Sequence, residues 1–434
     1  MADFTNMKQL CPTHFFFIAL FILFSGAKAE AEQYVTYSSW VTRARLPVLY
    51  VETPNSPWAV VQLHVRSNGS NVTADEHHLI GLWMRSMAEG KVQGSNLPSS
   101  QQQIEKLHGE VRAQQFVDQI IISDGIPAAS FSSGLRAMND RLKYRHRLSM
   151  SALTPLSFNT QRFEDVPLDV RQSLFPTHPY AFSRQENQPN ATNWLFTLNQ
   201  KLLKRQNIVL VVTGPMPAQK AQYVINTIFS TALPGGGEVI PTIHLPQGVR
   251  TIERSSLTTS ETKAPPTMSV AWFPITLENP VPTTAGEQEQ TKAQAKRFAA
   301  LKILAQITGG QTIHREGFAL LVLKTPLSNK KSISRQEVER LKELEHLARF
   351  SIKPQDLDIA RALCQAQLIR QWRAPEELAK SLGGATLRQG TPEFLNLELA
   401  AYDQVSPEDI QSLARELTTG THIMLRDAPS QENQ

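Results

Sequence analysis

Cysteine is scarce in this chain, where Cys11 and Cys364 are the only two among 434 residues. Cys11 lies in an N-terminal segment that we expect to be removed, so no intramolecular disulfide is predicted and Cys364 is expected to be a buried free thiol in a helix. An excess of one charge is also lacking, since 44 basic and 39 acidic residues give a net charge of only +5. So mild an excess does not indicate a nucleic-acid-binding protein.

Several catalytic signatures are missing as well. The eleven histidines form neither H-x-x-E-H nor H-E-x-x-H, the arrangements that place two zinc ligands and a general base on one face of a helix. There is no G-x-S-x-G nucleophile turn, no phosphate-binding loop and no dinucleotide fingerprint. These absences argue against the usual zinc-peptidase, serine-hydrolase and nucleotide-binding sites, and they leave an unfamiliar metal arrangement open.

An apolar run near the N-terminus, Phe15–Phe24, is too short for a comfortable membrane span. It follows Lys8 and precedes Ala27-Lys28-Ala29, which together are the pattern of a secretory signal peptide. We therefore predict a signal peptide at 1–29 with cleavage after Ala29, a periplasmic location, and no stable membrane span after cleavage. An uncleaved membrane anchor is the alternative.

The hydrophobic pattern predicts an α+β protein with two similar blocks. In the first block, strands are expected at 46–52, 59–65, 111–123 and 207–213, with helices at 73–90, 99–109, 130–143 and 217–231. In the second, strands are expected at 269–274 and 422–426, with helices at 284–308, 335–349, 353–382, 392–402 and 407–417. The similar order of elements predicts a structural duplication.

The expected domain boundaries follow from these blocks and from the Pro-Gly-Gly-Gly run at 234–237. An N-terminal domain is predicted at 33–233, a linker leading into the second domain at 234–266, a C-terminal domain at 267–427 and a short tail at 428–434.

Residues 78–90, HLIGLWMRSMAEG, resemble the zinc-site helix of the insulinase/pitrilysin metallopeptidases. Further segments are similar to that family in the same order, namely 46–52 with 60–66, 174–180 and 207–214. The likeness covers 40 to 425. It implies two tandem insulinase-like α/β-sandwich domains, each a mainly antiparallel sheet packed with helices, with the second shortened around 317–331 and the helix corresponding to the zinc site at 74–90.

In that frame the H-x-x-E-H positions are taken by residues that do not bind zinc. Gly81 stands at the first ligand position and has no side chain. Met84 stands at the position of the base and does not accept a proton. Arg85 stands at the second ligand position and repels a divalent cation. We expect Arg85 to pair with an acidic neighbour, although a peptide carboxylate is the alternative. No catalytic or metal-binding residue is therefore predicted at the usual positions.

The third zinc ligand and the second-domain residues of the family's active site also lack clear counterparts in this sequence. The resemblance implies a third zinc ligand, a Glu, for which Glu164 and Asp165 are the nearest acidic candidates, in a stretch expected to be a loop. It also implies an Arg from the second domain, which Arg315 resembles. No tyrosine follows Arg315 in register. His77 and His78 remain as alternative metal ligands with Glu164, although acidic and polar residues there also suit the first turn of a helix.

The resemblance implies a catalytically inactive homologue, and three hypotheses follow. The first is a non-catalytic subunit that pairs with an active zinc-peptidase paralogue to form a peptide-binding chamber. The second is a free-standing peptide-binding or scaffold protein, monomeric or homodimeric. The third is a metallopeptidase with a non-standard metal site, the only one of the three in which zinc is expected as a cofactor.

Overall fold

The computed structural model describes residues 35–67, 80–92, 98–116, 118–143, 146–147, 160–162, 166, 168–175, 191–230, 249–254, 268–277, 285–316, 318–326, 333–420 and 422–427. The predicted signal peptide lies outside them. From Tyr37 onward the chain forms one compact unit that contains two main sheets. Among the described helices, none is long and apolar enough to cross a membrane.

The first sheet contains seven strands in the order β1-β2-β9-β3-β6-β5-β8. These strands are β1 (Ser38–Val41), β2 (Pro47–Glu52), β3 (Trp58–Arg66), β5 (Glu110–Gln115), β6 (Gln119–Pro127), β8 (Thr160–Arg162) and β9 (Ile208–Gly214). Two short strands, β4 (Lys91–Val92) and β7 (His146–Arg147), pair separately. The sheet is mixed, because β2 runs parallel to β9 and β8 parallel to β5, while the other neighbours are antiparallel.

The second sheet contains five strands in the order β10-β14-β11-β13-β12. They are β10 (Val249–Arg254), β11 (Met268–Thr276), β12 (Gln311–Arg315), β13 (Phe318–Pro326) and β14 (His422–Asp427). Their pairing repeats that of β2-β9-β3-β6-β5, with one parallel pair followed by three antiparallel pairs. This repetition confirms the predicted duplication, and it makes α9 (Ala285–Thr308), between β11 and β12, the counterpart of α3 (Ile80–Glu89), between β3 and β5.

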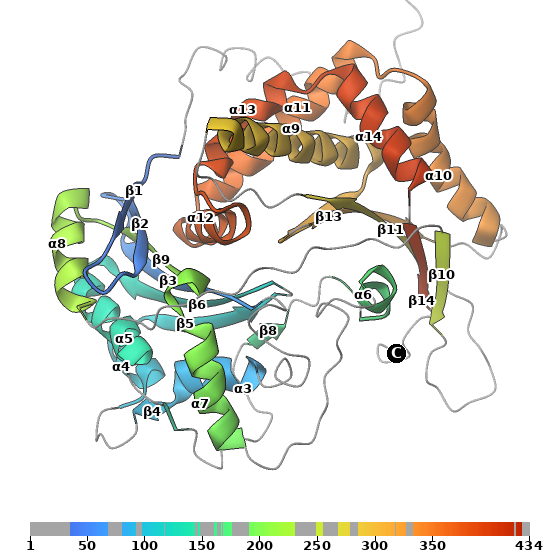
Figure 1. Ribbon diagram of the computed structural model, residues 1–434. Coiled ribbons are helices and arrows are strands. Elements are labelled where there is room, and N and C mark those ends of the chain that lie inside the picture. The colour runs from blue at the N-terminus through green and yellow to red at the C-terminus, as the bar shows by residue number, and fades with distance from the viewer. Residues whose placement is uncertain are drawn as a thin grey trace, which may run out of the picture. The chain divides into compact units, whose positions relative to one another are not determined.

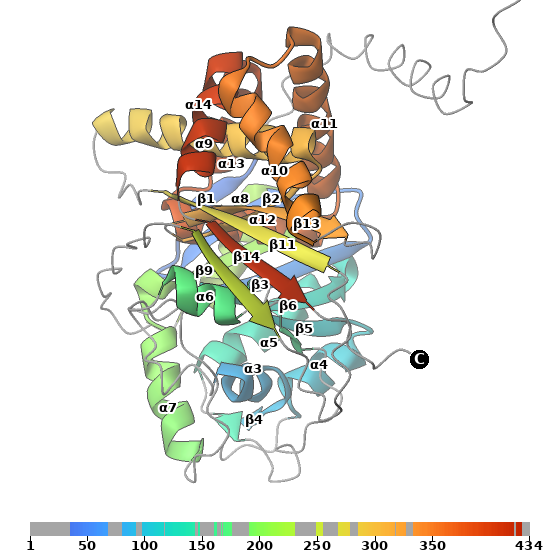
Figure 2. The same cartoon turned by 90° about the vertical axis from the view of Figure 1, so that its right-hand side faces the viewer.

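The remaining helices flank the sheets (Figures 1 and 2). In the first half they are α4 (Ser100–Lys106), α5 (Phe131–Lys143), α6 (Leu168–Leu174), α7 (Ala191–Leu202) and α8 (Ala218–Ile228), with short 3-10 turns at Ala128–Ser130 and Arg205–Asn207. In the second half they are α10 (Ile333–Arg349), α11 (Pro354–Trp372), α12 (Pro375–Gln389), α13 (Phe394–Gln404) and α14 (Pro407–Thr419). Both sheets are therefore covered by helices, as the predicted sandwich requires.

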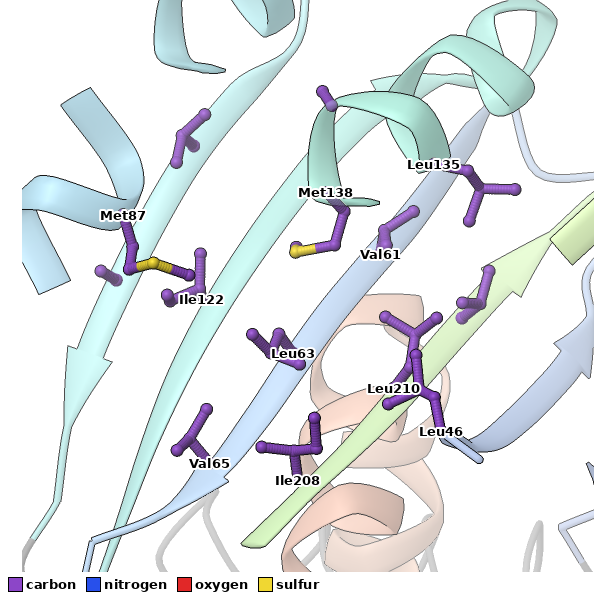
Figure 3. Close-up of a cluster of buried hydrophobic side chains, with 14 of the residues drawn as sticks. Leu46, Val61, Leu63, Val65, Met87, Ile122, Leu135, Met138, Ile208 and Leu210 are labelled. Atoms are coloured by element: carbon purple, nitrogen blue, oxygen red, sulfur yellow. The ribbon is translucent and has the colours of Figure 1, made fainter. Parts of the chain in front are cut away.

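The core of the first half lies between the sheet and the helices α3, α4, α5 and α8 (Figure 3). Side chains alternate across a strand, so β3 directs one set of residues toward this core and the other set toward the opposite face. Val61, Leu63 and Val65 point into the core and are fully buried. Gln62 and His64 point to the other face and are buried as well, because α12 from the second half covers that face.

A helix from each half packs on the sheet of the other half. While α12 packs on β3 and β9 of the first sheet, α6 of the first half contacts β10 and β14 of the second. Phe175, directly after α6, packs on Phe318 of β13 with ring centroids 4.6 Å apart, in a cluster that also contains Trp272. Each sheet therefore buries one face against the other half of the chain, and we expect the halves to unfold together.

Three sequence predictions differ from the structure. The strand expected at 111–123 is two strands, β5 and β6, joined by a tight turn around Asp118. The helix expected at 353–382 is two helices, because Pro375 has no amide hydrogen to continue α11 and instead begins α12. The strands β12 and β13 were not predicted at all, and neither were β10, α6 and α7.

Candidate functional site

Helix α3 holds the positions that correspond to the zinc motif, and it is fixed by core packing. Met84, at the position of the catalytic base, is completely buried within the main core cluster. Trp83 is 1% exposed, and its indole Nε1 donates a hydrogen bond of 3.0 Å to Oδ1 of Asn199 in α7. This face of α3 therefore serves as a wall of the core, with a thioether and an indole where a water-activating carboxylate would be needed.

The second ligand position is occupied by an ion pair within the helix. The guanidinium Nε of Arg85 lies 2.9 Å from the Oε2 of Glu89, one turn further along α3, and both side chains are largely buried. This confirms the expectation that Arg85 pairs with an acidic neighbour. Gly81, one turn before Arg85 on the same face, offers only its backbone. The residues present do not fit a zinc ion, since none of the three supplies an imidazole, thiolate or carboxylate.

The alternative metal ligands are not among the residues that the structure describes. His77, His78 and Glu164 lie outside the described residues. Among the residues that the structure does describe, no group of three or more His, Cys, Asp or Glu side chains is arranged to hold a metal ion.

Arg315, the second-domain candidate, belongs to a buried ionic network around Asp118. The Nε of Arg388 in α12 lies 2.7 Å from the Oδ2 of Asp118, and the backbone amide of Glu316 donates to the same oxygen at 2.9 Å. The Nε of Arg315 lies 3.9 Å from Oδ1. Burial raises the pKa of Asp118, but the charges of Arg388 and Arg315 outweigh it and hold the pKa below its usual value.

This network joins the two halves, since Asp118 lies between β5 and β6 while its partners come from the second half. Burial lowers the pKa of Arg315 to about 10, although the charge of Asp118 opposes the shift. The guanidinium carbon of Arg315 also lies 5.2 Å from the centroid of the Phe116 ring. Arg315 is thus engaged inside the protein, where it stabilises the contact between the halves.

A pocket of about 680 Å³ opens beside α9, the counterpart of α3. Its wall includes Lys302 of α9, Cys364 of α11 and Tyr402 of α13. Lys302 forms an ion pair with Glu398, and the hydroxyl of Tyr402 donates to Oε1 of Glu398 at 3.1 Å. Four glutamines also line the pocket, at positions 306, 311, 367 and 371.

The ionisable groups of this pocket are not poised for nucleophilic catalysis. Burial raises the pKa of the Cys364 thiol to about 11, so the thiol is protonated at neutral pH. Burial and the charge of Glu398 raise the pKa of Tyr402 well above its usual value. Its wall presents glutamine amides and the ammonium groups of Lys302 and Lys324, without an activated nucleophile among the described residues. The sequence did not predict it, because its wall combines α9, α11, α13 and the unpredicted strand β12.

Comparison with solved structures identifies the fold of this chain. Neither a protein-family model nor a curated protein sequence matches this chain. Solved structures do match. A protease from Helicobacter pylori has a TM-score of 0.69 at 12% identity, with 91% of this chain and 100% of that chain covered. An inactive peptidase M16 domain from Pseudomonas fluorescens has a TM-score of 0.66 at 14% identity, with 92% and 99% covered. This chain has the M16 peptidase fold. The fold that the insulinase/pitrilysin resemblance implied is thereby confirmed.

A third M16-fold match is the periplasmic protease PqqL from Escherichia coli, with a TM-score of 0.65 at 13% identity. The alignment covers 92% of this chain but only 46% of PqqL, so this chain corresponds to about half of that protein. M16 folds therefore occur both in chains of this size and in longer ones.

Proposed function

We propose that this protein is a non-catalytic M16-fold subunit that pairs with an active zinc-peptidase paralogue and completes a peptide-binding chamber. The observation that carries the proposal is the state of α3, where the positions of the motif are a glycine, a fully buried methionine and an arginine paired with Glu89. Helix α3 therefore packs in the core as the fold requires, but at the motif positions it carries neither zinc ligands nor a general base. One of the fold neighbours, the peptidase M16 domain from Pseudomonas fluorescens, is itself described as inactive.

The proposed location is the periplasm. The pattern of the first 29 residues supports secretion, and one of the M16-fold neighbours is a periplasmic protease. A partner for this chain would then be a secreted M16-type peptidase with an intact H-x-x-E-H motif.

Affinity purification of the tagged chain from its native host tests the pairing. We expect an M16-type zinc peptidase to co-purify in equal amounts and its peptidase activity to rise or change in specificity when this chain is added. Replacing the motif Glu of the co-purified peptidase by Gln should abolish activity, whereas Arg85→Ala in this chain should leave it unchanged. A chain that always purifies alone and never alters the activity of an M16 peptidase would contradict the proposal.

A second candidate function is that of a free-standing peptide-binding scaffold, and the pocket beside α9 favours it. Glutamine amides both donate and accept hydrogen bonds, as the backbone of a bound peptide requires, and four of them line the pocket. Isothermal titration of the purified chain with peptide libraries distinguishes this candidate. Binding without cleavage that is weakened by Gln371→Ala would support it, and absence of binding by the isolated chain would leave the paired form.

A further inference from the structure

Helix α11 carries an exposed apolar stripe along its outward side. Ile359 is 45% exposed and Leu363 is 39% exposed, and Ala362 and Ala366 lie beside them at helical spacing. The opposite side of the same helix is buried by Leu357, Ala360, Cys364, Leu368 and Trp372. The helix is therefore apolar on two sides, and only one of them is covered by the rest of the described chain. In Figure 2, α11 lies at the margin of the helical layer.

Charged residues end this stripe, with opposite signs at its two ends. Asp356 lies in the first turn of α11, and Arg370 and Arg373 lie at its C-terminal end. All three are exposed, and none forms an ion pair within the part of the chain that the structure describes. The stripe thus has an acidic end, an apolar centre with two small alanines, and a basic end.

This pattern is complementary to itself when two copies of α11 run antiparallel. A two-fold axis near the middle of the helix would place Asp356 of each copy opposite Arg373 of the other, at both ends of the pair. It would also place Leu363 against Ala366, where the small side chain allows close approach of the helices. The antiparallel arrangement further brings the positive end of each helix dipole beside the negative end of the other.

We propose that the outward face of α11 binds the same face of a second copy of this chain in an antiparallel, two-fold symmetric pair. The symmetry of the charge pattern is the reason to assign a second copy as the occupant, because an isologous interface must be complementary to itself. A contact over one helix of 19 residues is small, and it falls below the roughly 1,200–2,000 Å² typical of stable complexes. The expected dimer is therefore weak, with a dissociation constant in the micromolar range.

The proposal is independent of the pairing with an active paralogue. Residues of α11 are remote in sequence from α3, and none of the residues on the stripe was assigned to the peptide pocket or to the ionic network. A dimer through α11 and a failure to find a paralogue, or the reverse, are separate results.

Sedimentation of the mature full-length chain across about 1–200 µM tests the interface. We expect a concentration-dependent monomer–dimer equilibrium, and Leu363→Asp at its centre should raise the dissociation constant at least about tenfold. Val338→Asp is the matched control, because Val338 is an exposed aliphatic residue on the preceding helix α10, 51% exposed, and lies off the stripe. Circular dichroism and thermal unfolding confirm that each variant is folded.

Charge reversal tests the antiparallel register. Asp356→Arg and Arg373→Asp should each weaken self-association, since each places like charges together at both ends. An equimolar mixture of the two variants should dimerise again, because every end contact in the mixed pair joins opposite charges. A chain that stays monomeric throughout, a dimer that Leu363→Asp does not weaken, association only with a different protein, or a mixture that associates no better than either variant alone would overturn the proposal.

Discussion

Adding a single methyl group at Gly383 is expected to disrupt the contact by which the second half covers the first sheet. Gly383 lies in α12 with its backbone against the imidazole of His64 on β3, and a Cβ at this position would lie 2.4 Å from the ring atoms Cε1 and Nδ1. Both residues are buried. The ring is rigid and enclosed, so either α12 or β3 must shift to admit the methyl group.

The magnitude follows from this geometry. Overpacking a dense interior costs about 1–3 kcal/mol, while the replacement of glycine by alanine within a helix contributes up to about 1 kcal/mol in the other direction. We therefore expect Gly383→Ala to reduce the free energy of unfolding by about 1–2 kcal/mol. Gly384→Ala is the control, because the nearest atom to its Cβ would be Nη1 of Arg388 at 3.1 Å, at the end of a long side chain. The guanidinium needs to move by only a few tenths of an ångström, so this variant should cost clearly less than Gly383→Ala.

Urea denaturation followed by circular dichroism measures the difference as a shift of the midpoint at constant slope. The double variant Gly383→Ala with His64→Ala should recover part of the loss, since removal of the ring removes the clash, and the coupling energy should exceed about 1 kcal/mol. Equal stability of the two glycine variants, or strict additivity with His64→Ala, would refute the packing of α12 on β3.

The remaining predictions concern the ionic network and α3. Asp118→Asn should cost about 3–5 kcal/mol, because it leaves the largely enclosed guanidinium of Arg388 and the buried guanidinium of Arg315 without their counter-charge. The pKa of Asp118 is lower in the folded state than in the unfolded state. The stabilisation by its carboxylate is therefore present above the unfolded pKa and is lost as the pH falls through the folded pKa. On acidification below about pH 4, Asp118→Asn should lose less stability than the parent chain. An unchanged acid response would contradict this role. Met84→Glu should destabilise the protein by several kcal/mol, because position 84 is fully buried, whereas Met84→Leu should cost less than about 1.5 kcal/mol. Thermal unfolding of the two variants measures this difference. If the Glu variant were as stable as the Leu variant, this face of α3 would have to be open to solvent.

Local patterns predicted many elements of this fold from sequence alone. Ser99 forms the capping box that opens α4, with its side chain accepting from the amide of Gln102. The helices α5, α9 and α14 were expected within two residues of their bounds. Arg85 and Glu89 are one turn apart, so their pairing was also predictable.

Failures occurred where tertiary contacts decide the structure. The hairpin of β12 and β13 follows α9 closely. Its first strand is mostly polar, and its second begins with the short apolar run 318–323, which periodicity alone does not distinguish from a helix. The turn at Asp118 interrupts a stretch of strand-forming residues, and it is stabilised by Arg388, 270 positions away. No local pattern contains that information. The ionic network and the pocket beside α9 were missed for this reason, since each draws its residues from several distant segments.

The central claim is that α3 retains the position of a zinc-site helix without the residues to bind zinc. Metal analysis of the purified mature protein after equilibration with excess zinc and gel filtration, together with a peptidase assay of the same sample, tests this claim most directly. The account predicts substantially less than one zinc per chain and no cleavage of unfolded peptide substrates by the isolated chain. One tightly bound zinc per chain, with proteolysis that is lost on chelation and restored by zinc, would contradict it.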